Sequence, residues 1–131
     1  MRALPAIPRP GGTRHRVEIT GELRFAGEAG GGLRSFWRVV PLSAECGGRL
    51  FALRCEAGPG EIELDLHGVL QRDGVLTATI ALQLRTGAGE DVLEAETASV
   101  RCGAEVPFVV TCFDAGGRQV EVRGLLGNCR A

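Results

Sequence analysis

The chain has 131 residues and a formal net charge of −1, from 15 basic and 16 acidic side chains, so it is long enough for one domain with a buried core. This charge balance excludes the basic surplus on which generic binding to nucleic acids or anionic membranes depends. No segment approaches the roughly 18 consecutive apolar residues of a membrane span, and the first residues contain prolines but no apolar signal core. We therefore expect a cytoplasmic protein with neither a nucleic-acid nor a membrane partner.

The composition informs on the source and the thiol state rather than on an activity. All basic residues other than histidine are arginine, and lysine and tyrosine are absent, which is typical of a GC-rich, bacterial genome and predicts no arginine-specific role. An odd number of cysteines without an export signal predicts reduced thiols, several of them buried: Cys46, Cys55, Cys102, Cys112 and Cys129. Disulfides pairing 46 with 55 or 102 with 112 stay open. No cysteine spacing fits structural zinc, so we expect no metal and no cofactor.

From the N-terminus, residues 1–13 are rich in proline and glycine, which predicts a flexible arm ahead of a single all-β domain over 14–131. Within that domain, short segments of high β-propensity alternate with glycine-rich turns. Asp73-Gly74 predicts a type I′ hairpin turn. The expected strands cover residues 15–26, 33–42, 49–56, 60–71, 74–86, 91–102, 106–114 and 118–126.

The expected strands are of two kinds. One kind alternates polar and apolar residues, over 16–25, 61–70 and 75–85; the other is apolar on both faces, over 35–42, 50–55 and 106–113. Side chains alternate between the faces of a strand, so the first kind has one wet face and the second has none. We expect the second face of the apolar segments to be covered, either by the chain's own arm or by another chain.

The segment 91–102 is ambiguous between helix and strand. Asp91 would cap a helix, with Glu94 three residues later and Gly103 beyond its end, whereas Thr97 and the missing helical stripe favour a strand. We expect a strand and keep one short helix as the alternative. The chain then predicts an antiparallel all-β fold of about eight short strands, as a barrel or a sandwich.

One short pattern recurs three times in the alternating strands. Residues 17–23, 64–70 and 120–126 all share the order apolar, acidic, apolar, any residue, glycine, any residue, leucine. Glycine inside a strand marks a bend, a bulge or a close backbone approach. We expect Gly21, Gly68 and Gly124 to let the sheet curl.

No constellation of catalytic groups can be assembled from spacing alone, so we predict no catalytic residues. The two histidines, His15 and His67, lack a metal-ligand spacing and a neighbouring nucleophile motif. Glu61, Glu63 and Asp65 line one strand face, which predicts a solvated surface rather than a pair of catalytic carboxyls. A Cys–His pair stays open, because such partners meet in space rather than in sequence.

The apolar segments supply the candidate binding residues. Most aromatic side chains of the chain lie in them, and arginines flank Phe36 and Trp37, as at many interface hot spots. We expect a non-catalytic binding or assembly module that self-associates or docks a protein partner through an apolar β-hairpin over 33–56. The alternative is a small β-barrel that binds an apolar small molecule, with or without cyclase- or isomerase-like activity. The candidate residues are Arg34, Phe36, Trp37, Arg38, Phe51 and Phe108.

Overall fold

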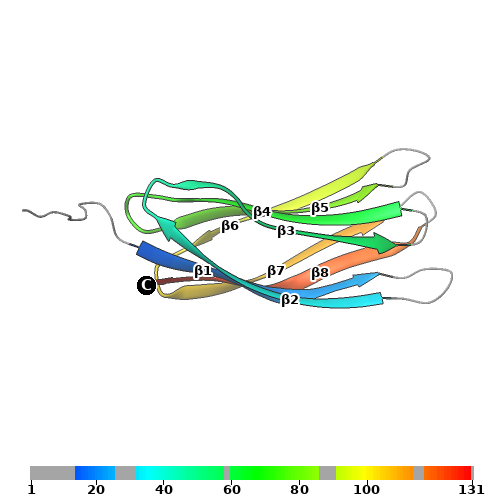
Figure 1. The fold of residues 1–131 in the computed structure, drawn as a ribbon, viewed down its shortest axis with the longest axis horizontal. Coiled ribbons are helices and arrows are strands. Elements are labelled where there is room, and N and C mark those ends of the chain that lie inside the picture. The colour runs from blue at the N-terminus through cyan, green and yellow to red at the C-terminus, as the bar shows by residue number, and fades with distance from the viewer. Residues whose placement is uncertain (1–13, 26–31, 58–59, 86–90, 114–116, 131) are drawn as a thin grey trace, which may run out of the picture.

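The fold is known from a computed structural model that describes residues 14–25, 32–57, 60–85, 91–113 and 117–130; the predicted arm over 1–13 lies outside these residues. The described residues form eight strands and no helix, packed as two antiparallel sheets (Figure 1). The strands are β1 (Arg14–Phe25), β2 (Gly32–Ser43), β3 (Gly47–Ala57), β4 (Gly60–Leu70), β5 (Leu76–Arg85), β6 (Val92–Val100), β7 (Ala104–Phe113) and β8 (Gln119–Arg130).

The two sheets form a sandwich. Sheet A has the order β2-β1-β8-β7 and sheet B the order β3-β4-β5-β6, so the chain runs up and down through successive strands and β8 returns to pair with β1. Among the described residues no ladder joins β2 to β3 or β6 to β7, which confirms the sandwich alternative over the barrel. The segment 91–102 contains strand β6, so the helix alternative was wrong; Thr97 hydrogen-bonds Thr79 on β5 (3.3 Å).

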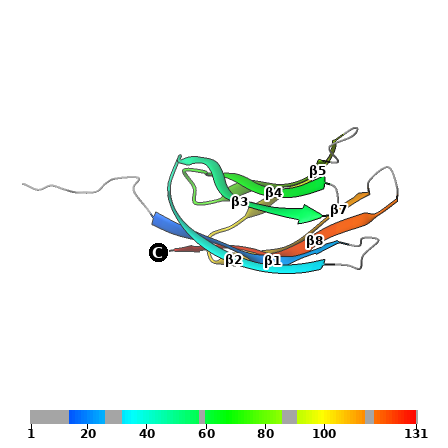
Figure 2. The same ribbon diagram turned by 45° about the vertical axis from the view of Figure 1, so that its right-hand side comes forward.

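The predicted apolar hairpin over 33–56 does not form. β2 pairs with β1 and β3 pairs with β4, so the two strands lie in different sheets. A corner joins them, in which Cys46 N donates to Ser43 O (3.0 Å) and Glu45 takes a positive φ of 65°. Figure 2 shows this corner passing from one layer to the other. The prediction was wrong because two apolar segments adjacent in sequence do not specify which partners they pair with.

Alternation along the central strands builds the core, as predicted. β5 buries every second residue from Leu76 to Leu84, and β4 does the same from Ile62 to Leu70. β1 contributes Val17 and other fully buried side chains from sheet A. Burying one such side chain contributes about 1.5–3 kcal/mol, so packing between the sheets is the main stabilising interaction of the sandwich.

Two glycines meet on the inner face of sheet A. Gly21 on β1 pairs with Gly124 on β8, and the next strands outward place Phe36 beside Gly21 and Phe108 beside Gly124. A Cβ at Gly124 would lie 2.0 Å from Thr20 O, which leaves no room for a side chain. The glycines therefore mark a close approach of two backbones, without a shift of register, and the two phenyl rings cover the inner surface there.

The three segments that are apolar on both faces prove to be edge strands: β2 and β7 border sheet A, and β3 borders sheet B. Such edges invite pairing with another chain, and inward-pointing charges are one protection against it. On β2 the inner face carries Arg34 and Arg38, opposite core residues of β1; on the edge strand β6 it carries Glu94 and Glu96, opposite core residues of β5. The chain has no lysine at these edges, and arginine and glutamate take its place.

Candidate functional site

The six candidate binding residues are divided between the two faces of the sheets. Trp37 points outward from sheet A, whereas its neighbour Phe36 points into the core, because successive side chains alternate. Arg34 and Arg38 lie on the inner face of β2, at its open edge. The predicted cluster of arginines around Trp37 therefore does not form.

The predicted aromatic residues other than Trp37 are core residues. Phe36 on β2 stacks on Phe51 on β3, with ring centroids 5.6 Å apart and an interplanar angle of 27°. The guanidinium of Arg38 lies 5.6 Å from the Phe51 centroid, on the solvent side of the pair. Phe108 is buried on the inner face of β7. These three rings therefore belong to the core of the sandwich.

Trp37 begins an apolar row that crosses the outer face of sheet A. The row follows the strand register: Trp37 on β2 pairs with Thr20 on β1. Thr20 pairs with Leu125 on β8, and Leu125 pairs with Pro107 on β7. The Trp37 side chain is 66% exposed, and Leu125 and Val109 on the same face are also exposed. An exposed apolar patch on a sheet is a candidate interaction surface. We call these five residues the sheet A patch.

The sheet A patch has a projection and a hollow. An open hollow of about 410 Å³, with mainly apolar walls, lies over β1, β8 and β7 and is lined by Thr20, Pro107, Val109 and Leu125, among others. Trp37 stands on the other side of Thr20, and its Nε1 donates a hydrogen bond to Glu18. That bond holds the indole in one orientation, which lowers the entropy lost when it is buried by a partner.

Charged side chains around the patch are balanced in sign. On the same face Arg24 pairs with Glu22 (3.4 Å) and Arg123 with Glu121 (2.9 Å). Both pairs are largely exposed and contribute little to stability. The patch therefore has no strong electrostatic potential that would favour a nucleic acid or another highly charged partner.

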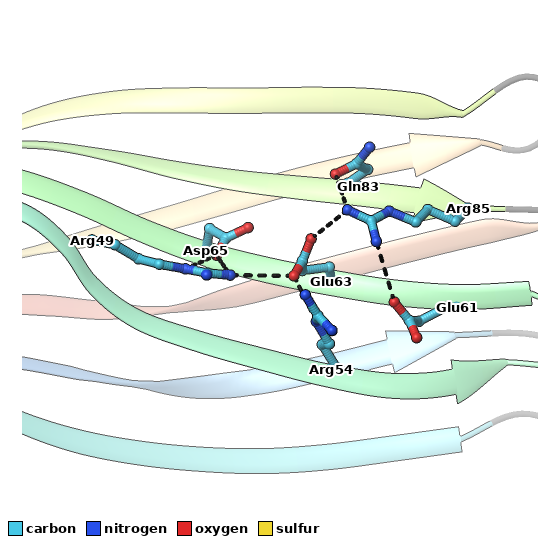
Figure 3. Close-up of polar contacts among 7 residues, drawn as sticks. All are labelled: Arg49, Arg54, Glu61, Glu63, Asp65, Gln83 and Arg85. Carbon is cyan, nitrogen blue, oxygen red and sulfur yellow. Dashed lines mark hydrogen bonds and ion pairs between the residues drawn. The ribbon is translucent and has the colours of Figure 1, made fainter.

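The outer face of sheet B carries a network of charged side chains (Figure 3). Glu63 on β4 accepts hydrogen bonds from Arg49 (3.2 Å) and Arg54 (2.7 Å) on β3 and from Arg85 (3.0 Å) on β5. Arg49 also donates to Asp65 (2.7 Å). The network joins three neighbouring strands across their outer face.

Glu63 is 3% exposed although it points outward, because the three guanidinium groups cover it. The hydrogen bond from Arg54 lowers the pKa of Glu63; burial opposes this effect, and the arginine charges reinforce it. The prediction of a solvated face was therefore wrong for this residue. A carboxylate held ionised by three cations is a poor general acid or base, so the network is a clamp on the sheet.

A second buried polar group lies inside one end of the sandwich. His15 on β1 is 1% exposed, and its Nδ1 lies 2.7 Å from Oδ1 of Asn128 on β8. The amide nitrogen of Asn128 donates to Gly74 O and Val100 O, both at 2.9 Å. Asn128 thereby ties β8 to β1, to β6 and to the turn between β4 and β5.

That turn differs from the type I′ turn predicted for Asp73-Gly74. Only Gly74 has a positive φ (89°), and the hydrogen bonds run from Gly74 N to Gln71 O (2.9 Å) and from Gln71 N to Val75 O (2.8 Å). This pattern is a three-residue loop that ends in a glycine in the left-handed region. Asp73 caps it by accepting a hydrogen bond from Val75 N (3.1 Å).

All five cysteines are free, so the disulfide alternatives do not form; Cys55 and Cys112 are buried and the other three are exposed. Burial raises the pKa of the Cys112 thiol to about 11, and burial also raises the pKa of Cys55. In the part of the chain that the structure describes, no three histidine, cysteine or acidic side chains are grouped so that they could hold a metal ion.

An open cleft of about 530 Å³ separates the edges of β2 and β3 near Phe25. Arg34 enters it from the inner face of β2, and its charge partly offsets the burial that raises the pKa of Cys55. Within the described residues Arg34 forms no ion pair or hydrogen bond. The lining residues are Phe25, Gly32, Leu33, Arg34, Arg54, Cys55, Glu56 and Glu61.

Two features of these sites were missed in the sequence. The hollow beside Trp37 depends on Leu125 and Val109 from the β7–β8 hairpin, which the long-range pairing of β8 with β1 places next to Thr20. Asn128 carried a signal: it is the only asparagine of the chain and follows an apolar segment in the last strand. A lone amide at a strand position needs partners when it is buried.

Comparison with protein families, with curated proteins and with solved structures found no match. No helix among the described residues is long and apolar enough to cross a membrane.

Proposed function

We propose that this protein is a non-catalytic assembly module, and that a second copy of the chain binds to the sheet A patch. The observation that carries the proposal is the exposed indole of Trp37 next to an open apolar hollow on the same face. The docking hairpin predicted over 33–56 does not form, so the proposed interface is the outer face of sheet A instead.

A second copy is favoured because the patch is complementary to itself. A two-fold axis that runs along the outer face of sheet A, parallel to the strands and above Thr20, would place each Trp37 over the hollow of the other copy, which is the isologous arrangement of most dimers. Reciprocal burial of two tryptophans supplies the aromatic anchors on which protein interfaces depend. The mixed signs of the surrounding charges suit contact between identical faces.

The area of the face is sufficient for a weak or moderate dimer. Four strands spaced about 4.8 Å apart, with about ten residues each rising about 3.3 Å, give a face of roughly 600 Å². Two such faces would bury on the order of 1,200 Å², which is the lower limit for specific interfaces. The dimer would then contain one further contact between two sheets, with the two Trp37 side chains on either side of its axis.

Sedimentation velocity over a range of concentrations tests the proposal. We expect a reversible dimer for the wild type and a monomer for Trp37→Glu, because removing one strong anchor should raise the dissociation constant by at least about 30-fold. Leu93→Glu is the matched control: Leu93 is 62% exposed, but on the outer face of sheet B. A wild type that stays monomeric at 100 μM-scale concentrations (roughly the range of weak dimers), or an equal effect of the control, refutes the proposal.

A second candidate function is binding of a small molecule with an apolar body and one anionic group. It is supported by the cleft between β2 and β3, where Arg34 forms no ion pair with any described residue, although Glu56 and Glu61 also line the cleft, and Phe25 and Leu33 offer apolar walls. Titration with octanoate, followed by amide NMR, tests it. Shifts confined to the cleft that disappear in Arg34→Gln support it, and no shifts at millimolar octanoate reject it.

A further inference from the structure

The hydrogen-bond network around His15 defines which ring nitrogen carries the proton. The two carbonyls beside Asn128, those of Gly74 and Val100, can only accept, so the amide nitrogen faces them and Oδ1 is left as an acceptor. His15 Nδ1 must therefore donate to Oδ1 and carry the proton. The neutral ring then has its lone pair on Nε2.

This lone pair has no hydrogen-bond partner among the described residues, although His15 is almost completely buried. A buried acceptor without a partner is rare and calls for an explanation. His15 Nε2 and the Cβ of Cys102 each lie 3.9 Å from the point where a Cβ of Gly74 would sit. Because Gly74 has no side chain, it does not separate the imidazole from Cys102.

We propose that Cys102 is a nucleophilic thiol activated by His15, with Asn128 as the positioning residue that orients the imidazole. Cys102 is exposed on the turn between β6 and β7, so its side chain is accessible to a reagent, and rotation about its Cα–Cβ bond moves Sγ between staggered positions on the side of Gly74 that also faces the imidazole. In cysteine nucleophiles of this type an imidazole accepts the thiol proton, and an amide side chain orients the imidazole. In the absence of substrate such hydrogen bonds are often not yet formed.

The substrate class that fits an exposed thiol on a turn is a low-molecular-weight disulfide. Cys102 Sγ–H transfers its proton to His15 Nε2, and the thiolate attacks one sulfur of the disulfide. A bond forms between Cys102 Sγ and that sulfur, the substrate S–S bond breaks, and the leaving thiolate takes the proton from Nε2. The products are a mixed disulfide on Cys102 and one free thiol, so no further oxidant is needed.

The chain contains its own controls for this proposal, since Cys46 and Cys129 are also exposed thiols. The probe is 4,4′-dithiodipyridine at pH 6.5, where an ordinary exposed thiol is only about 1% ionised. After an acid quench, tandem mass spectrometry of peptides measures the rate at each cysteine and distinguishes Cys102 from the buried Cys112. We expect Cys102 to react at least about tenfold faster than the two controls.

Two variants assign the effect. In His15→Phe we expect the Cys102 rate to fall to that of the controls, whose own rates stay unchanged; Asn128→Ala should lower the Cys102 rate in the same selective way. Loss of fold would change all three rates together, which separates a structural role from a positioning role. Equal rates at the three exposed thiols in the wild type overturn the proposal, whether or not a variant folds. A folded His15→Phe protein with a fast Cys102 also overturns it.

The proposal is independent of self-association. Cys102 lies at one end of the sandwich, on the turn that joins the sheets, whereas the sheet A patch lies on the outer face of β2, β1, β8 and β7. Trp37→Glu should therefore leave the Cys102 rate unchanged, so the two ideas can fail separately.

Discussion

Asn128→Ala should cost more stability than any other single polar deletion of comparable size in the described part of the chain. The substitution removes the hydrogen-bond partner of two buried groups, the Nδ1–H of His15 and the carbonyl of Val100, and of the half-buried carbonyl of Gly74. Each unsatisfied buried group costs about 1–3 kcal/mol, and such costs are not fully additive. We expect the free energy of unfolding to fall by about 3–5 kcal/mol, a large part of the roughly 5–15 kcal/mol available to a domain.

Urea denaturation followed by circular dichroism measures this loss. With an m value of about 2 kcal/mol per molar urea, the midpoint should fall by about 1.5–2.5 M. Arg130→Ala, at an exposed position on the same strand, is the control and should change stability by no more than about 0.5 kcal/mol. In a double-mutant cycle with His15→Ala, the double variant should lose about 1 kcal/mol less stability than the sum of the losses of the two single variants. A loss below about 1.5 kcal/mol with an additive cycle would refute the assignment of a coupled buried network.

Two further predictions concern pH. Because the pKa of Glu63 is lowered in the folded protein, its contribution is complete above the ordinary value of 4.5 and is lost as the pH falls through the lowered value. Glu63→Gln should therefore cost about 1–2 kcal/mol at pH 7 and progressively less as the pH falls below 4.5, by urea midpoints; a cost that stays constant down to acid unfolding contradicts this. Burial raises the pKa of Cys112 from 9.0 to about 11, so its stabilising effect is complete below pH 9 and is lost as the pH rises toward 11. The chain contains no lysine and no tyrosine to titrate in that window. Cys112→Ala should therefore make the loss of stability between pH 9 and 11 smaller, as measured by urea midpoints. An unchanged loss of stability in this variant would show that the buried Cys112 thiol does not cause it.

The alternating segments illustrate how far local patterns can be trusted. In β1, β4 and β5 the apolar side of each strand is the buried side, as period-two alternation predicts. The apolar segments behaved differently, since β2, β3 and β7 are edge strands and two of them leave apolar side chains in solvent. Strands of this composition are expected at the centre of a buried sheet. The exposed apolar side chains of edge strands β2 and β7 depart from this expectation, and they form part of the sheet A patch.

The candidate residues show the limit of neighbourhood along the chain. Arg34, Trp37 and Arg38 look like one cluster in sequence, yet alternation sends Trp37 outward and both arginines to the opposite face. Glu63 shows the same limit for charge: its strand neighbours suggested a solvated row, and arginines from β3 and β5 cover it. In each case the missing information was which strands pair and in which register.

The amino-acid order sufficed for the number of strands, their places along the chain and the side of each central strand that is buried, because side-chain direction and turn chemistry act over a few residues. The long-range pairing of strands was needed for everything that brings distant residues together. Trp37 and Leu125 share one face because β1 pairs with β2 on one side and with β8 on the other. His15 contacts Asn128, which lies 113 residues later in the chain. Register and sheet packing depend on the summed burial of the whole core, and no short segment contains that information.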